Sequence, residues 1–238
     1  EQVYKATEIQ YDLLPLTQTG IDSKALFETS ADILHTTPYR SYPSGVTATA
    51  SKRHEYVRWA SEGDRYIIED DYDSEFRFAA HPLPTMQSLD TSGRVIYMNT
   101  FSKSLAPSIR ISYMVLPAGL MAQFQQKLGF YSCTVPSFEQ YTLARFLSRG
   151  YFEKHINRMR KFYRARRERV VQMLRQCAAA PSLTILEQDA GLHFLLQVDS
   201  LLSDEQLVQQ LAGKGIRVRA LSEYFHDRPE DRRCLVVN

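Results

Sequence analysis

The sequence predicts an α/β protein, because short apolar segments alternate along the chain with longer amphipathic ones. The composition agrees with this fold class: 44% of the 238 residues are hydrophobic and 24% are charged, which allows a sizeable core. After Pro181 the pattern changes to strand-like segments with one helix between them. We therefore expect a large α/β unit followed by a smaller α+β unit.

Apolar segments predict the strands and helices of the larger unit. The first three strands carry apolar residues at consecutive positions, as expected for parallel strands covered on both faces. The predicted strands are Ala31–His35, Tyr66–Glu69, Arg94–Met98 and Ile111–Leu116, and Tyr11–Gly20 is predicted as a strand and turn. The predicted helices are Ser51–Ser61, Leu120–Phe130 and Phe138–Leu147.

One long amphipathic helix is predicted over Tyr151–Gln176, because apolar residues recur there at intervals of three and four. The opposite face is basic, and its cations are Lys154, Arg158, Arg160, Lys161, Arg164, Arg166, Arg167, Arg169 and Arg175. Such a face could bind nucleic acid. No base-stacking aromatic residues accompany the cations, which favours a solvated face or a subunit contact.

The last part of the sequence predicts a small α+β domain. Its predicted strands are Leu183–Leu186, Leu192–Val198, Ile216–Val218 and Cys234–Val237, with a helix over Asp204–Leu211. We predict a partial large domain over residues 1–150, a connecting helix over 151–180 and a truncated small domain over 181–238. The sequence ends inside the apolar run CLVVN and opens directly on a strand-and-turn pattern, so we expect a fragment of a longer protein.

Composition argues against several classes of protein. Lysine and arginine number 29 against 27 acidic residues, a balance too even for a protein that acts mainly as a polycation. No run approaches 18 apolar residues, and the opening EQVYKATEIQ is not a signal peptide, so no membrane segment is expected. Cys133, Cys177 and Cys234 are far apart, and the histidines show no ligand-like spacing. These patterns favour a reducing, cytoplasmic setting and no structural metal.

The segment IIEDDYDSEFR, residues 67–77, carries the first candidate for chemistry. An apolar strand runs there directly into four acidic residues and a tyrosine. Carboxylates at the carboxyl end of a parallel strand lie where α/β proteins place their ligand sites. An acidic loop with a local capping role is the alternative.

The segment NTFSKSLAPSIR, residues 99–110, carries the second candidate. Lys103 lies among hydroxyls and apolar residues just past a buried strand, where a desolvated amine can act as a nucleophile that forms an imine. The hydroxyls of Thr100 and Ser102 with the guanidinium of Arg110 would suit a phosphate dianion. An acid on the neighbouring strand could hold a heteroaromatic nitrogen protonated. Together these groups describe pyridoxal 5′-phosphate (PLP) bound as a Schiff base, and a surface lysine after a strand is the alternative.

These two segments resemble the aminotransferase-like effector domain of MocR/GabR-type bacterial transcription regulators. Thr37–Gly45 (TPYRSYPSG) is similar to the TPxHxxPTG segment of that family, and Ala190-Gly-Leu-His193 also matches. The resemblance implies a fold type I PLP-dependent domain, with a large α/β sheet between helices and a small α+β C-terminal domain. In that family an N-terminal GntR-type winged helix-turn-helix domain binds DNA.

The resemblance also assigns roles to residues of this sequence. Lys103 would be the catalytic lysine that forms the Schiff base, Asp70 would pair with the pyridine nitrogen, and Tyr72 would hydrogen-bond the phenolic oxygen of the cofactor. The phosphate-binding positions of the family fall on Thr100, Ser102 and Arg110.

Some positions depart from related enzymes. Tyr42-Pro-Ser-Gly45 stands where aminotransferases carry Asn-Pro-x-Gly, and Tyr39-Arg40-Ser41 replaces a histidine-containing stretch. The glycine-containing phosphate loop and the ring stacked on the cofactor belong to a part of the fold outside this sequence. Arg217 and Arg219 could clamp a substrate carboxylate, or they could be solvated strand residues.

The resemblance therefore implies the effector-binding and oligomerisation domain of a cytoplasmic GntR/MocR-type regulator. Such a domain binds PLP, senses an amino-acid-like effector and forms a homodimer, and DNA is bound only through the N-terminal domain. The alternative is a PLP-dependent aminotransferase that acts on an amino acid and a 2-oxo acid. A dimerisation scaffold that has lost its cofactor is a third possibility.

Overall fold

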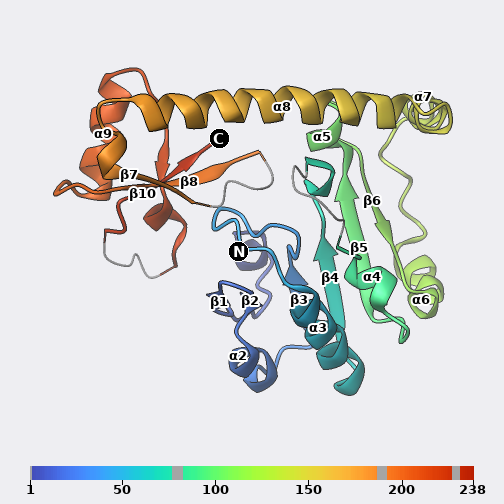
Figure 1. The fold of residues 1–238 in the computed structure, drawn as a ribbon. Helices are drawn as coiled ribbons and strands as arrows, with labels where there is room; N and C mark the ends of the chain where they lie inside the picture. Colours follow the sequence, from blue (N-terminus) through green and yellow to red (C-terminus); the bar gives the residue numbers. More distant parts are fainter. Residues whose placement is uncertain (1, 77–82, 187–191, 227–230) are drawn as a thin grey trace. The chain divides into compact units, whose positions relative to one another are not determined.

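The chain forms two units in a computed structural model that describes residues 2–76, 83–186, 192–226 and 231–238 (Figure 1). The first unit consists of Glu1–Tyr39, Val46–Tyr72 and Pro82–Thr134, and the second of Arg40–Gly45, Asp73–His81 and Val135–Asn238. Two short segments from the first half of the sequence thus belong to the second unit. The predicted domain boundaries at residues 150 and 180 stay predictions.

The first unit is built on a four-stranded sheet in the order β3-β4-β5-β6 (Figure 1). Its strands are β3 (Ile33–Thr36), β4 (Tyr66–Asp70), β5 (Val95–Thr100) and β6 (Ser112–Val115). The first three are parallel to one another, as their consecutive apolar residues predicted, and β6 is antiparallel to β5. All three parallel strands therefore end at the same edge of the sheet.

Short helices and a hairpin complete the first unit. They are α1 (Gln2–Ala6), β1 (Leu16–Thr17), β2 (Gly20–Ile21), α2 (Ser23–Glu28), α3 (Ala50–Glu62), α4 (Met86–Leu89), α5 (Phe101–Ser104) and α6 (Ala118–Leu128). Thr49 caps α3 by accepting a hydrogen bond from the backbone N–H of Lys52. Helix α3 presents Tyr56 and Trp59 to the core, where they join Ile67 of β4 in one buried cluster.

The hydroxyl of Tyr56 connects α3 to the β1–β2 hairpin. It accepts a hydrogen bond of 2.6 Å from the backbone N–H of Ile21, and burial raises the pKa of Tyr56 to about 12. Gly20 has a φ of +135°, and a Cβ atom there would collide with the same hydroxyl. Glycine is therefore required at this turn both for its backbone conformation and for the space that Tyr56 occupies.

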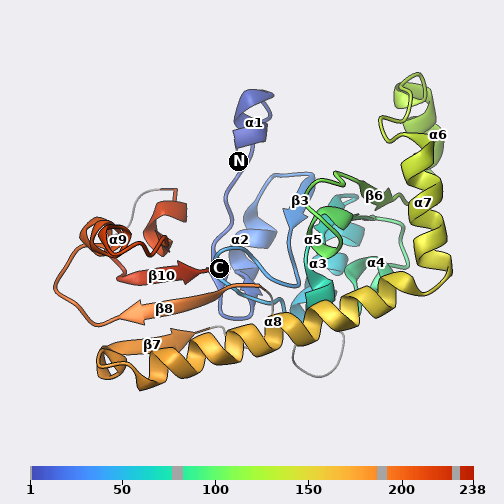
Figure 2. The ribbon, with the colours of Figure 1, turned by 90° about the horizontal axis from the view of Figure 1, so that it is seen from above.

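The second unit is built on an antiparallel sheet in the order β7-β8-β10-β9. Its strands are β7 (Leu183–Leu186), β8 (Phe194–Val198), β9 (Arg219–Ala220) and β10 (Cys234–Val237). Figure 2 shows β7, β8 and β10 side by side. Alternate residues of the sheet enter two apolar clusters, one around Leu195 and Val236 and the other around Phe194 and Leu235.

The helices of the second unit flank this sheet. They are η1 (Ser74–Phe76), α7 (Ser137–Ser148), α8 (Tyr151–Gln176), η2 (Ala180–Ser182), α9 (Asp204–Gly213) and η3 (Leu221–Tyr224). Helix α8 has the predicted limits, and Ile156 and Val171 of its apolar stripe region are buried. The ring of Tyr163 packs edge-on against that of Phe76, with centroids 5.6 Å apart. Phe162 and Met173 of the same stripe are exposed.

The strand predicted over Ile216–Val218 is wrong. The backbone N–H of Ile216 bonds to the carbonyl of Leu211, so this residue still belongs to the turn that ends α9. Only Arg219 and Ala220 reach β10, where they pair with Val236 and Leu235. The alternating pattern IRVRA was read correctly as extended, but its first part lacks a neighbouring strand.

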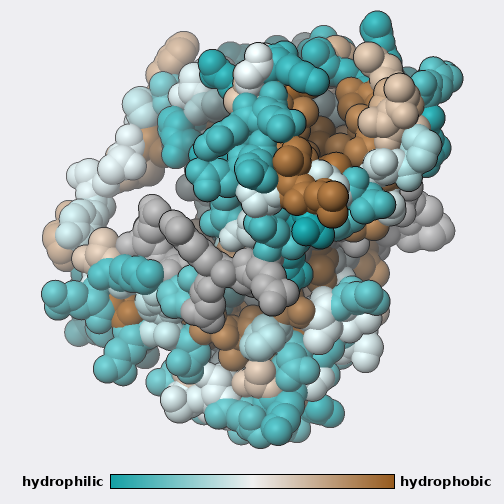
Figure 3. All heavy atoms as spheres, turned by 90° about the vertical axis from the view of Figure 1, so that its left-hand side faces the viewer, coloured by the Kyte–Doolittle hydropathy of each residue, from teal (hydrophilic) through white to brown (hydrophobic). Residues whose placement is uncertain are grey.

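Hydrophilic residues cover much of the face seen in Figure 3, with hydrophobic residues gathered in one area of it. Among the described residues, no helix combines the length and apolar character needed to cross a membrane. The same part of the chain holds no group of three histidine, cysteine or acidic side chains placed to bind a metal ion.

Candidate functional site

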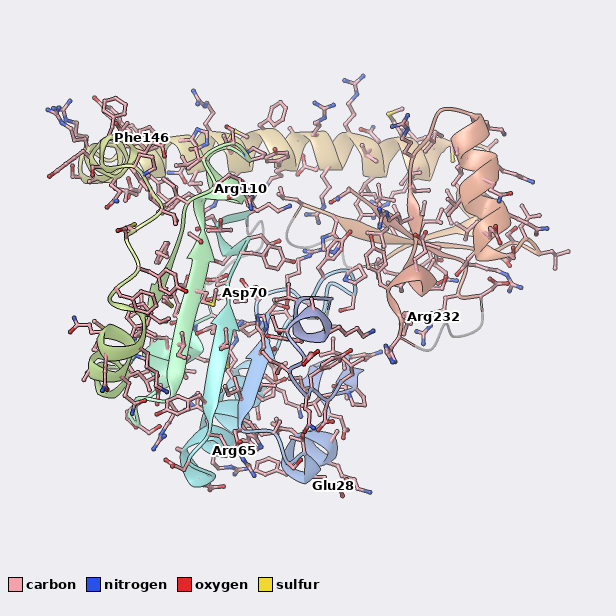
Figure 4. All side chains as sticks on the ribbon, turned by 180° about the vertical axis from the view of Figure 1, so that it is seen from behind. Glu28, Arg65, Asp70, Arg110, Phe146 and Arg232 are labelled. Carbon is pink, nitrogen blue, oxygen red and sulfur yellow. The ribbon has the colours of Figure 1, made fainter. Side chains whose placement is uncertain are left out.

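The candidate site lies at the carboxyl edge of the parallel strands β3, β4 and β5. Asp70 is the last residue of β4 and Thr100 is the last residue of β5. The parallel register sets Asp70 beside Met98, so that both strands end close together. Figure 4 shows Asp70 at the tip of β4 and Arg110 in the segment that follows β5 and α5. This is the edge at which open α/β sheets bind ligands.

Three residues predicted to hold phosphate are connected around the single-turn helix α5. Thr100 caps this helix: its Oγ1 accepts from the backbone N–H of Ser102 at 3.2 Å and donates to the carbonyl of Ile111 at 3.2 Å. Nη1 of Arg110 donates to Oγ of Ser102 at 3.5 Å. Both hydroxyl residues are half-buried and Arg110 is exposed, so the guanidinium remains accessible from solvent.

Lys103 lies on the same helical turn, between Ser102 and Ser104. Its side chain is exposed, whereas Ser104 is 2% exposed and takes the buried position of the turn. The expected desolvation of this lysine is therefore not found in this chain. The reason is local, because a helix of one turn directs only one of its central side chains inward, and here that residue is a serine.

The acidic residues of the EDDYD segment have different surroundings. Glu69 is fully buried, and its carboxylate accepts hydrogen bonds of 2.9 Å from the backbone N–H groups of Met86 and Gln87 at the start of α4. Burial raises the pKa of Glu69 despite these bonds. Oδ2 of Asp71, also buried, accepts a bond of 2.8 Å from the hydroxyl of Tyr97.

Asn99 extends the Asp71 contact, because its Nδ2 donates to the Tyr97 hydroxyl at 3.0 Å. Burial, together with the charge of Asp71, raises the pKa of Tyr97, so the phenol keeps its proton and donates it to the carboxylate. Glu69 and Asp71 are thus held in structural contacts on either side of Asp70. Asp70 is the half-exposed acid of the three, and its carboxylate faces the edge of the sheet.

His35 is the neighbour of Asp70 that the sequence interpretation missed. Its Nε2 lies 3.5 Å from Oδ2 of Asp70, and its Nδ1 is hydrogen-bonded to the hydroxyl of Tyr4. Partial burial, and then the charge of Asp70, raise the pKa of Tyr4, so that this phenol donates to Nδ1. The Nε2–H of the neutral imidazole is then directed at the carboxylate. A polar residue near the end of a buried parallel strand beside β4 was the available signal.

The remaining predicted residues are placed as follows. Tyr72 is half-buried at the end of a segment of the first unit. His193 is buried at the start of β8, whereas Arg77, Ala190 and Gly191 of the recognised motifs lie outside the described residues. The structure thus brings Thr100, Ser102 and Arg110 into contact, and it pairs Asp70 with His35.

Comparison with known proteins places this geometry in a family. The family model described as aminotransferase class I and II matches residues 10–234, which is almost the whole chain. This chain belongs to the aminotransferase class I and II family. The large parallel sheet followed by a small antiparallel one, inferred from the sequence, is accordingly the fold of PLP-dependent aminotransferases.

Curated relatives within this family include transcription regulators. The helix-turn-helix-type transcriptional regulator YhdI of Bacillus subtilis is 38% identical, over 88% of this chain and 45% of the relative. The probable rhizopine catabolism regulatory protein MocR of Rhizobium meliloti is 37% identical, over 91% of this chain and 44% of the relative. The chain spans about half the length of these relatives, and the predicted resemblance to MocR-type regulators is confirmed.

A solved structure of an enzyme is similar as well. The kynurenine aminotransferase of Pyrococcus horikoshii is 28% identical and superposes with a TM-score of 0.79, covering 96% of this chain and 58% of the enzyme. The family therefore contains both regulators and enzymes that share this domain, and fold alone does not separate them.

Proposed function

We propose that this chain is part of the effector-binding and oligomerisation domain of a GntR/MocR-type transcription regulator. In this proposal the domain binds PLP covalently through Lys103 and responds to an amino-acid-like effector. DNA would be bound by a separate N-terminal domain, and the regulator would act as a homodimer in the cytoplasm. The observation that carries the proposal is the set of groups at the sheet edge: the half-exposed Asp70, the amine of Lys103 and the Ser102–Arg110 pair.

The residues present fit PLP by their chemistry. The cofactor needs donors for a phosphate dianion, an acid for its ring nitrogen and a primary amine for its aldehyde. In the described part of the chain, neither Arg110 nor Lys103 forms an ion pair with a carboxylate. Two cations and adjacent hydroxyls therefore stand ready for an anion at one edge of the sheet, with a single accessible acid nearby.

Bound PLP would supply an aldehyde that reacts with amines and a ring that withdraws electrons from the bonded group. Arg110 and Ser102 would bind its phosphate through charge-assisted hydrogen bonds, and Thr100 would fix the helical turn that carries them. The carboxylate of Asp70 would hold a proton on the ring nitrogen, because a nearby negative charge favours the protonated form. His35 would keep that carboxylate in position, and Tyr72 would donate to the phenolic oxygen.

The response to an effector follows from competition between amines. An amino acid carries a primary amine of the same kind as Nζ of Lys103, so it can take the place of the lysine on the cofactor. Lys103 would then be free to move and to regain a proton. A change in charge and position at one residue of a single-turn helix is the kind of local event that can shift a conformational equilibrium.

The proposal is tested by DNA binding of the complete regulator. We expect PLP together with a cognate amine to change the affinity for its operator DNA, and the Lys103→Ala variant to lose this response. The matched control is Lys127→Ala, which removes an exposed lysine of α6 and should respond like the wild type. Equal DNA affinity and equal promoter output with and without the cofactor would refute the regulator proposal.

The second candidate function is amino-group transfer to a 2-oxo acid, which the similarity to the Pyrococcus horikoshii enzyme favours. It predicts steady turnover of an amino acid with 2-oxoglutarate, and loss of that turnover in Lys103→Ala. A protein that binds PLP and changes its DNA affinity without such turnover is a regulator. A protein that binds no PLP is neither, which leaves the scaffold.

A further inference from the structure

Two tyrosines of the second unit, Tyr42 and Tyr224, form a hydroxyl pair that the site described above does not use. Their oxygen atoms lie 3.0 Å apart and their rings meet edge to face, with centroids 5.4 Å apart. Tyr42 is 43% exposed and Tyr224 is half-buried, so the pair is accessible from solvent. Tyr42 stands in the Tyr-Pro-Ser-Gly segment, at the position where aminotransferases carry asparagine.

The segment that carries Tyr42 is fixed by buried contacts. Nη2 of Arg40, a residue only 4% exposed, donates to the carbonyl of His193. The ring of His193 is hydrogen-bonded through Nε2 to the carbonyl of Pro43 at 3.2 Å and meets the ring of Tyr42 at 4.9 Å. The hydroxyl of Tyr42 is therefore held in place by a rigid frame, and little conformational entropy is lost when it binds a ligand.

A count of hydrogens shows what the pair can offer. Two phenols contain two hydroxyl hydrogens, and the bond between Tyr42 and Tyr224 uses one of them. Burial and the bond with Tyr224 raise the pKa of Tyr42 to about 12, although the charge of Arg219 opposes this shift. Tyr42 is therefore protonated at neutral pH, and one O–H of the pair remains to donate to an acceptor outside the protein.

Arg219 supplies a positive charge beside this donor. It lies on β9, where its backbone pairs with Val236, and its side chain is exposed. Its charge acts on Tyr42, and within the described ranges it forms no ion pair with a carboxylate. The acid nearest in sequence, Glu223, instead accepts a hydrogen bond of 2.8 Å from the backbone N–H of Ala220.

We infer that the second unit carries a carboxylate-binding subsite formed by the guanidinium of Arg219 and the hydroxyl pair of Tyr42 and Tyr224. One guanidinium and one O–H donor match an acceptor of single negative charge, which is a carboxylate rather than a phosphate dianion. This inference rests on the proposed function in one respect, namely that the carboxylate belongs to the amino-acid-like effector.

The test separates the two ends of the effector with three probes. L-Alanine carries both groups, ethylamine lacks the carboxylate and propionate lacks the amine. Binding of propionate to the complete protein without cofactor is followed by saturation-transfer NMR, and the response of the PLP absorbance is titrated with L-alanine and ethylamine. We expect Arg219→Gln to weaken propionate and L-alanine about 10- to 100-fold, as for loss of a charge-assisted hydrogen bond, and to leave ethylamine unchanged.

Two further variants complete the experiment. Tyr224→Phe removes one hydroxyl and should weaken propionate by a smaller factor, whereas Arg217→Gln removes an exposed arginine two residues away and should have no effect. Propionate that fails to bind the wild type, or that binds Arg219→Gln equally well, overturns the subsite. If Lys103 takes up no PLP but propionate still binds through Arg219, then the proposed function fails while the subsite stands.

Discussion

Replacement of Arg53 by methionine is expected to lower the free energy of unfolding by about 3–5 kcal/mol, as for other broken buried ion pairs. Arg53 is fully buried in α3, and its guanidinium donates to three backbone carbonyls: Ala48 at 3.1 Å, Pro84 at 2.8 Å and Pro38 at 3.1 Å. It also lies over the ring of Tyr39, 4.2 Å from the centroid. The variant leaves these carbonyls without a donor.

The charge of Arg53 also stabilises the buried carboxylate of Glu69, whose pKa burial raises. Since that pKa lies above its ordinary value of 4.5, the folded state takes up a proton at a pH where the unfolded chain has lost it. Stability from this group therefore falls as the pH rises through that window. Loss of Arg53 extends the window upward, so the deficit of the variant should shrink as the pH is lowered toward 4.5.

Urea unfolding of the wild type and of Arg53→Met at several pH values measures both effects. The control is Arg58→Met, which removes an exposed arginine of the same helix that lies over Phe27, and it should cost less than about 1 kcal/mol. The double variant Arg53→Met with Glu69→Gln should recover part of the loss. Equal stability of Arg53→Met and Arg58→Met would show that the buried arginine does not hold this edge of the sheet together.

Substitution of Asp70 by asparagine is expected to weaken PLP binding to the complete protein by about 10- to 100-fold, which corresponds to about 1.5–3 kcal/mol for a hydrogen bond to a charged group. Asparagine keeps the shape of the side chain but removes the charge that would favour a protonated ring nitrogen. Glu69 and Asp71 cannot replace it, because both are held by other donors.

Equilibrium titration of PLP, followed by the absorbance of the bound cofactor, measures this affinity. His35→Ala should show a smaller loss of the same kind, because His35 acts only through the position of Asp70. Asp64→Asn, an exposed acid that pairs with Arg94, should bind PLP like the wild type. Wild-type affinity in Asp70→Asn, or an equal loss in Asp64→Asn, would remove Asp70 from the proposed site.

Much of the local structure followed from sequence patterns. The limits of α8 and β10 and the parallel arrangement of β3, β4 and β5 were predicted because each depends on the spacing of apolar residues within one segment. Composition of the two units was not predictable in this way. Residues 40–45 and 73–81 belong to the second unit through contacts with distant parts of the chain, such as the bond between Arg40 and His193.

The candidate site shows the same division. Asp70, Lys103 and Arg110 were found by their chemistry and their motifs, and they lie at or near one edge of the sheet. The roles of Glu69 and Asp71 could not be distinguished from that of Asp70, because they depend on donors from α4 and β5. Arg53 gave no signal at all, since an arginine on an amphipathic helix is ordinarily expected at the surface.

Borohydride reduction of the complete protein with PLP, followed by peptide mapping, tests most directly whether Lys103 holds the cofactor. We predict one stable pyridoxyl adduct, located on Lys103 and absent from Lys103→Ala, with exposed lysines such as Lys127 unmodified. An adduct on a different lysine, or none on a protein that is folded and saturated with PLP, would contradict the proposed cofactor site.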